Sequence, residues 1–321
     1  MKNVLSIDGG GIRGIVTAHI LNNIEKLLQE YTNNKNEKLI NHFDLCAGTS
    51  TGSIIVAILN IKDKNGIPLY SCQDVLDMYN NESQYIFKRT FKHKIKSLFG
   101  LIKVKYNNKY LKDTLNKYLK NTKVQDTYKN TMITSVNLND NSLFLFKSYG
   151  SNQEYNLSDA VLASSAAPTY FKPIKIYKKD TPITLTDGGM GMNNPTLSSY
   201  LECKKLYKDD NINILSLGTG YKTKPLQYNK VKKWGIAKWL KEIVNTILTA
   251  NNRATDYQCN MLYKHIINGN YTRINGELFY ASNKIDDVSN KNLENLQKDA
   301  QVIFDNNKFE IINFIYDCII Q

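Results

Sequence analysis

A serine between two glycines is the first feature of this sequence that suggests catalysis. Residues 48–52 read Gly-Thr-Ser-Thr-Gly, with Ser50 at the centre. The apolar run Phe43–Ala47 suits a buried strand, and Ile54–Leu59 suits a helix. A Gly-x-Ser-x-Gly turn between strand and helix holds its serine at an exposed tip, where the helix N-terminus favours developing negative charge. The pattern predicts a nucleophilic serine; the alternative is a turn that only caps a helix.

A second glycine-rich loop lies near the start of the chain. Val4–Ile7 is a short strand candidate, residues 8–14 read Asp-Gly-Gly-Gly-Ile-Arg-Gly, and Ile15–Gln29 has helical apolar spacing. A P-loop would need Gly-Lys-Ser/Thr, which this loop lacks. A dinucleotide site would need an acidic residue at the end of the second strand, where this chain has the Ser50 turn instead.

The remaining interpretation of this loop is an oxyanion hole. The amides of Gly10 and Gly11, supported by Arg13, would face a tetrahedral intermediate. Parallel strands that end side by side would bring the loop next to Ser50, at the carboxyl edge where α/β proteins place their sites. Only this interpretation gives both glycine loops a common purpose.

A carboxylate followed by two glycines comes after a third strand candidate. Thr184–Thr186 has β-type composition and ends in Asp187-Gly188-Gly189. A carboxylate at such a strand-to-loop junction, followed by two glycines, lies tight against the backbone and is a candidate site residue. The alternative is a simple Asx-turn, which Asp-Gly often forms.

The other elements alternate between strands and helices up to about residue 220, which predicts a mostly parallel sheet with helices on both faces. Further strands are expected at Thr131–Asn137, Leu143–Lys147 and Asn211–Leu217. Further helices are expected at Gln73–Asn80, Tyr110–Leu119, Leu157–Ser165 and Gln301–Ile320.

Taken together, the three motifs resemble the signatures of the patatin-like phospholipase family, in the family's order. Ala163–Phe171, Asn194-Pro195 and Leu215–Gly220 also look familial, so the resemblance covers roughly Val4–Gly220. It implies a three-layer α/β/α fold, with residues 1–220 as the catalytic core. Residues 221–321 carry no such signature and are expected to be a helical extension packed on the core or part of the same domain.

The resemblance also implies the roles of the site residues. Ser50 matches the nucleophile and Asp187 the general base of a Ser-Asp dyad. The oxyanion loop matches Gly9, Gly10, Gly11 and Arg13, and the remaining motif glycines are Gly14, Gly48, Gly52, Gly188 and Gly189. The implied activity is hydrolysis of acyl esters of lipids, of the phospholipase A or lysophospholipase type, through an acyl-enzyme and without a metal or other cofactor.

Two other functions compete with this one. A Ser-His-Asp esterase would need a histidine after Asp187, and only His265 follows it. A non-enzymatic, basic membrane-binding protein would use the net charge of +13 instead of the serine. Nucleic-acid binding rests on that charge alone and is not expected.

Composition indicates where such a protein would act. The five cysteines are dispersed without a CxxC pair, which argues against a disulfide framework and against zinc. The sequence shows neither a signal peptide nor a transmembrane stretch, so we expect a cytoplasmic protein that associates peripherally with anionic membranes. Residues 86–106 and 232–248 mix basic and apolar side chains and are the candidate interfacial segments. The alternative is that each is a surface element that packs on the core through its apolar side chains. A homo-oligomer or a regulatory ligand is compatible with the sequence.

Overall fold

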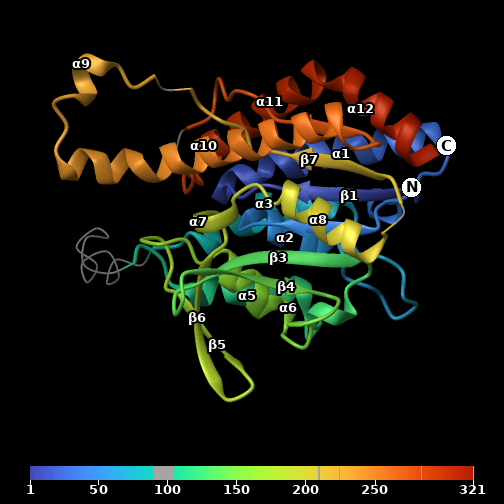
Figure 1. The fold of residues 1–321 in the computed structure, drawn as a ribbon, viewed down its shortest axis with the longest axis horizontal. Helices are drawn as coiled ribbons and strands as arrows, with labels where there is room; N and C mark the ends of the chain where they lie inside the picture. Colours follow the sequence, from blue (N-terminus) through green and yellow to red (C-terminus); the bar gives the residue numbers. More distant parts are fainter. Residues whose placement is uncertain (90–103, 209, 224, 283, 321) are drawn as a thin grey trace.

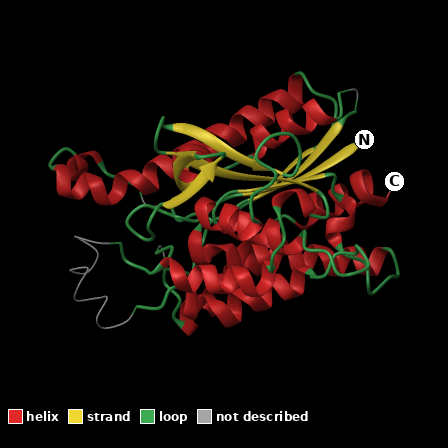
Figure 2. Ribbon diagram, turned by 90° about the horizontal axis from the view of Figure 1, so that it is seen from below, coloured by secondary structure: helices red, strands yellow, loops and turns green. Residues whose placement is uncertain are grey.

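The computed structural model describes residues 1–89, 104–208, 210–223, 225–282 and 284–320. They form an eight-stranded mixed sheet with helices on both faces (Figure 1, Figure 2). The strand order is β5-β6-β3-β2-β1-β7-β8, with β4 paired to β3. The three-layer α/β/α class predicted from the sequence is confirmed.

The centre of the sheet is parallel. Its strands are β1 (Lys2–Ile7), β2 (Leu45–Gly48), β3 (Asn130–Asn137), β7 (Ile212–Leu217) and β8 (Tyr271–Ile274). β1 lies between β2 and β7, with Ile7 opposite Gly48. Because parallel strands end at the same edge, the loops that follow β1 and β2 lie side by side.

Antiparallel strands extend the sheet beyond β3. They are β4 (Ser142–Lys147), β5 (Ile174–Lys178) and β6 (Thr181–Asp187). β3 places Ile133 opposite Gly48 of β2 and Ser135 opposite Asp187 of β6. β6 therefore enters at the carboxyl edge of the parallel strands, runs against their direction and ends level with the loop after β2.

Helices cover the two faces unequally (Figure 2). The larger group comprises α1 (Gly14–Tyr31), α2 (Thr51–Leu59), α3 (Cys72–Ile86), α5 (Asn108–Leu119), α6 (Leu157–Ser164), α11 (Asn290–Asn306) and α12 (Lys308–Ile315). The opposite face carries α8 (Thr196–Leu206) and α10 (Ile236–His265). Two one-turn helices, α7 (Gly189–Met192) and α9 (Tyr228–Val231), lie in connections.

The strands alternate between two apolar cores. Val4 and Ile214 face the core under α8 and α10, whereas their neighbours Leu5 and Leu215 face the core under α1 and α2. All four side chains are buried. A central strand that is buried on both faces reads as a continuous apolar run, which is why β1 and β7 were recognisable in the sequence.

The C-terminal third differs from the sequence prediction. Residues 221–321 are not purely helical, because they also supply the edge strand β8. Four residues are too few for a strand pattern to stand out. The single helix predicted over Gln301–Ile320 is instead divided at Asn307, which has non-helical backbone angles, into α11 and α12.

Two membrane-related predictions have different outcomes. Most of the candidate interfacial segment 86–106 lies outside the described residues. Among the helices that are described, none combines the length and the apolar character needed to cross a bilayer.

Candidate active site

Ser50 sits on a sharp turn between β2 and α2. Its backbone angles, φ 51° and ψ −120°, are strained for a residue with a side chain. A Cβ on Gly48 would collide with the carbonyl of Gly52, and a Cβ on Gly52 would collide with the carbonyl of Ile7. The two flanking glycines therefore allow the strand, the turn and the helix to pass within contact distance. The Ser50 amide donates to Ser164 Oγ at 2.9 Å, which fixes the turn further.

Asp187 accepts a hydrogen bond from the hydroxyl group of this serine. Ser50 Oγ donates to Asp187 Oδ2 at 2.7 Å, and the Gly189 amide donates to Asp187 Oδ1 at 2.7 Å. The aspartate side chain is buried, and burial raises its pKa from 3.8 to about 6, although both hydrogen bonds oppose the shift. Asp187 is thus oriented by backbone and is a stronger base than an exposed aspartate.

The glycine loop after β1 lies against the same site. Gly11 has φ +60°, and a Cβ there would collide with the carbonyl of Ile285. The Ile12 amide donates to that carbonyl at 2.9 Å, and the Gly9 amide donates to Asn193 O at 3.0 Å. Within the described part of the chain, the amides of Gly10 and Gly11 donate to no acceptor.

Arg13 borders this loop without an ion pair among the described residues. Its Nε lies 3.5 Å from Gly10 O, and its side chain lines the same cavity as Ser50. Burial lowers the pKa of Arg13, and the charge of Asp8 opposes that change. Gly14, the last residue of the motif, begins α1.

A buried polar network supports the glycine loop from behind. Arg273 of β8 holds both carboxylate oxygens of Asp8, at 2.9 and 2.5 Å. Burial disfavours the charge of Arg273, but the charge of Asp8 and the bonds to it outweigh this and raise the pKa of Arg273. Asn252 of α10 donates to Asp8 Oδ2 at 3.3 Å and accepts from Asn193 Nδ2 at 3.0 Å.

Asn193 also contacts the glycine loop directly. Asn193 Nδ2 lies 3.3 Å from Gly9 O, and Thr219 Oγ1 donates to that oxygen at 3.0 Å. The end of β1 is therefore connected, through Asp8 and Gly9, to residues near the ends of α7, β7, β8 and the middle of α10.

These groups open into one cavity of about 1360 Å³. Ser50 and Asp187 line it together with Gly9, Gly10 and Gly11. Part of its wall is apolar and comes from α2, α3, α5 and the loop before β5; the residues are Ile54, Tyr79, Ile86, Phe87, Leu111, Tyr170 and Phe171. The cavity thus joins a polarised serine to a surface suited to a hydrocarbon chain.

The rival triad is not assembled in this structure. His265 is exposed at the end of α10, and the described lining of the cavity contains no histidine. Asp187 contacts the serine directly, with no ring between them.

Comparison with known proteins identifies the family. A sequence model described as patatin-like phospholipase matches residues 5–200. The chain belongs to the patatin-like phospholipase family. It is similar to Patatin-like protein 4 of Arabidopsis thaliana, with 31% identity over 96% of this chain and 84% of that protein. It is also similar to Patatin-07 of Solanum tuberosum, with 30% identity over 92% and 81%.

One solved structure is also similar. The match to VipD from Legionella pneumophila has a TM-score of 0.40 and 13% identity, over 95% of this chain and 67% of that one. Membership of the patatin-like phospholipases confirms the prediction of a serine-type lipid acyl hydrolase.

Several residues of this patatin-like site were not predicted. Asn193, Asn252 and Arg273 carry no local motif, because they come from separate elements and meet only in the fold. Asp8 stood in the first motif without an assigned role. Ser164 lay in the stretch Ala163–Phe171, but nothing in the sequence paired it with the Ser50 amide.

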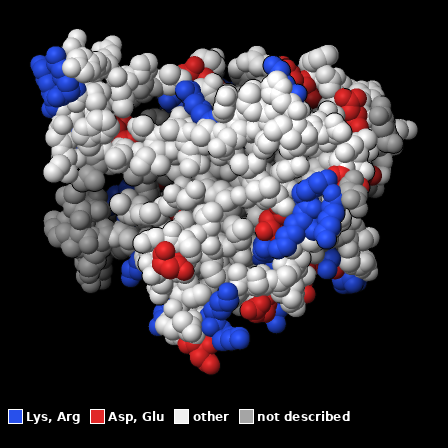
Figure 3. All heavy atoms as spheres, in the orientation of Figure 1, with Lys and Arg blue, Asp and Glu red and all other residues white. Residues whose placement is uncertain are grey.

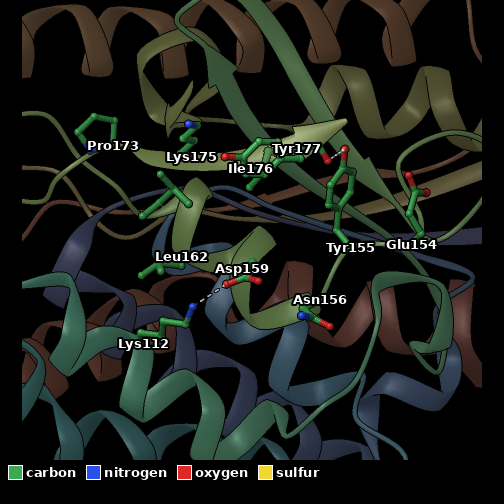
Figure 4. A pocket seen from close by; sticks show the side chains of 11 residues that line it. Lys112, Glu154, Tyr155, Asn156, Asp159, Leu162, Pro173, Lys175, Ile176 and Tyr177 are labelled. Atoms are coloured by element: carbon green, nitrogen blue, oxygen red, sulfur yellow. Dashed lines mark hydrogen bonds and ion pairs between the residues drawn. The ribbon is translucent and has the colours of Figure 1, made fainter. Parts of the chain in front are cut away.

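A second pocket, of about 570 Å³, lies between α5, α6 and β5 (Figure 4). It shares no lining residue with the first. Lys112 and Asp159 form an ion pair across it at 3.1 Å, and Tyr155 Oη donates to Tyr177 O at 3.1 Å. Its lining lacks a serine, threonine or cysteine nucleophile, so the first cavity, which contains Ser50 and Asp187, is the candidate active site.

Proposed function

We propose that this patatin-like chain hydrolyses carboxylic esters of membrane lipids with a Ser50–Asp187 dyad. The observation that carries the proposal is the 2.7 Å hydrogen bond from Ser50 Oγ to a buried Asp187, on the wall of a cavity with an apolar lining. The apolar part of the cavity suits the acyl chain. The expected type is a phospholipase A or lysophospholipase.

In the first half of the reaction, Asp187 takes the hydroxyl proton as Ser50 Oγ attacks the ester carbonyl. We infer that the amides of Gly10 and Gly11 donate to the oxyanion, a role supported by their lack of other acceptors among the described residues. Collapse of the intermediate breaks the ester bond, and Asp187 returns the proton to the leaving alcohol.

In the second half, water attacks the acyl-enzyme. Asp187 now takes a proton from that water and returns it to Ser50 as the fatty acid leaves. Burial matters in both halves, because a base with a pKa of about 6 is ionised at neutral pH and yet accepts a proton more readily than an exposed aspartate.

The test uses Ser50→Ala and Asp187→Asn, each assayed on soluble short-chain esters and phospholipid vesicles in EDTA. Both variants should lose at least about 10³-fold in kcat while retaining the wild-type circular dichroism. A fluorophosphonate should label Ser50 in the wild type and not in Ser50→Ala. The matched controls are the exposed changes Ser142→Ala and Asp180→Asn, which should keep full activity. Wild-type turnover in either dyad variant would overturn the proposal.

A further inference from the structure

The segment 225–247, which we call the arm, projects from the body of the molecule. It contains α9 and the first turns of α10, and Figure 1 shows it reaching well beyond the sheet. The other end of α10 packs against α8 and β8. The arm is therefore attached to the core at one end, through the C-terminal part of α10.

One side of the arm carries an exposed apolar stripe, which we call the arm ridge. Its members are Ile236, Trp239, Ile243 and Ile247, with exposed fractions of 80, 38, 39 and 52%. Steps of three, four and four residues keep them on one side of the helix, over a length of about 17 Å. A lone exposed apolar residue needs no explanation, but a continuous helical stripe marks an interaction surface.

The arm ridge runs into the mouth of the catalytic cavity. Ile247 is both a ridge residue and part of the cavity lining. Leu226 and Met190 also line the cavity while remaining exposed. Thr246 and Ala250 of α10 also line the cavity. An acyl chain that leaves a surface in contact with the ridge therefore meets the cavity beside Ile247.

Basic side chains predominate around the ridge. The arm sequence contains five lysines and a single acidic residue, Glu242; the lysines are Lys230, Lys232, Lys233, Lys238 and Lys241. Figure 3 shows basic side chains at the tip of the arm, where α9 lies. The ridge also holds Trp239, whose ring meets that of Trp234 edge-on at 5.6 Å. Tryptophan with lysine beside an apolar stripe suits the headgroup region of a bilayer.

We propose that the arm ridge inserts into the surface of an anionic bilayer and so places the cavity mouth against the lipid esters. The proposal rests on the proposed function for its substrate but not for the binding itself. A second copy of the chain fits the ridge less well, because it would bring a second set of lysines to the same contact.

Intrinsic fluorescence tests the insertion directly. Trp234 and Trp239 are the two tryptophans of the chain, so all tryptophan emission comes from the arm. The probe is a vesicle of phosphatidylcholine and phosphatidylglycerol with brominated acyl chains, which quench a tryptophan on contact. Full-length Ser50→Ala protein prevents hydrolysis during the measurement. We expect brominated vesicles to quench the tryptophan emission strongly and unbrominated vesicles not to quench it. If the protein instead pellets with brominated vesicles while its emission is not quenched, another surface binds the bilayer and the proposal is overturned.

The paired variant Ile236→Ser/Ile243→Ser tests the ridge residues, neither of which lines the cavity. It should weaken partitioning onto these vesicles by about tenfold or more. Ile266→Ser is the matched control, since this isoleucine is 76% exposed just beyond the other end of α10. Equal partitioning of the ridge variant and wild type, or an equal loss in the control, would overturn the proposal.

Two further readouts separate the possible failures. Hydrolysis of a soluble short-chain ester should stay within about twofold of wild type in the ridge variant, because the dyad is untouched. If no ester is turned over but the ridge still governs vesicle binding, the proposed function fails and the insertion stands. If the ridge variant instead changes a wild-type dimer into a monomer without loss of vesicle binding, the ridge is a self-association surface and the insertion fails.

Discussion

At the scale of single residues, Asp187 combines two opposing demands. It must be ionised to accept the Ser50 proton, yet burial favours its neutral form and raises its pKa to about 6. The hydrogen bonds from Gly189 N and Ser50 Oγ hold part of that shift back. The base is therefore half-ionised close to pH 6, more than a unit above the usual range of aspartate.

This pKa predicts the pH dependence of the reaction. Below pH 6, Asp187 is protonated and cannot act as a base, so kcat/KM for a soluble ester should fall about tenfold for each pH unit. Above pH 6 the rate should approach a plateau. The measurement is kcat/KM of the wild type between pH 4.5 and 8. A half-maximum near pH 4 would mean that Asp187 is not buried in the working enzyme.

A histidine base would give a similar midpoint, so the profile needs a second enzyme for comparison. His265→Ala should have the wild-type profile and the wild-type plateau, because His265 is exposed and does not line the cavity. If the acidic limb disappears in His265→Ala, the Ser-His-Asp mechanism is correct instead.

At the scale of elements, β8 and α10 supply the groups that hold the glycine loop in place. Arg273 neutralises Asp8, and Asn252 connects Asp8 to Asn193, which in turn contacts Gly9. Within the described part of the chain, none of these side chains forms a hydrogen bond with Ser50. They act through the loop, so we regard them as positioning residues for the Gly10 and Gly11 amides.

These contacts predict that Asn252→Ala lowers kcat and leaves KM unchanged. The loop would lose a bridge between Asp8 and Asn193, and a small misplacement of oxyanion donors costs transition-state stabilisation more than ground-state binding. We expect kcat on a soluble ester to fall about tenfold with KM within about twofold. Asn251→Ala, one position away on α10, is the matched control and should match wild type. A raised KM with normal kcat would assign Asn252 to substrate binding.

The same elements show what the sequence could and could not predict. The short motifs at Ser50 and Asp187 could be recognised in the sequence, because a tight turn and close contact between backbone segments restrict the residue types allowed there. Arg273 was not, since an arginine in a four-residue edge strand becomes informative only when β7 brings β8 into register with β1. Asn252 lies on a thirty-residue helix whose polar positions look alike until the fold selects one.

At the scale of the whole molecule, the family resemblance that ended near Gly220 does not mark the end of the folding unit. Residues beyond it add β8 to the sheet, lay α11 along α1, and supply the Ile285 carbonyl that receives the Ile12 amide. We infer that residues 1–220 and 221–321 are one cooperative domain, in which the second part completes the site of the first.

A chain ended at residue 220 is therefore expected to lose both fold and activity. It would expose the edge of β7, uncover the apolar face of α1, and deprive Asp8 of its partner Arg273. Such losses are large against the roughly 5–15 kcal/mol that stabilises a typical domain. The measurement is cooperative thermal unfolding by circular dichroism together with turnover of a soluble ester. A chain ended at Ile315 keeps β8, α11 and α12 and should retain both properties. Cooperative unfolding with wild-type kcat in the 1–220 chain would show instead that the core is autonomous and that Arg273 is dispensable.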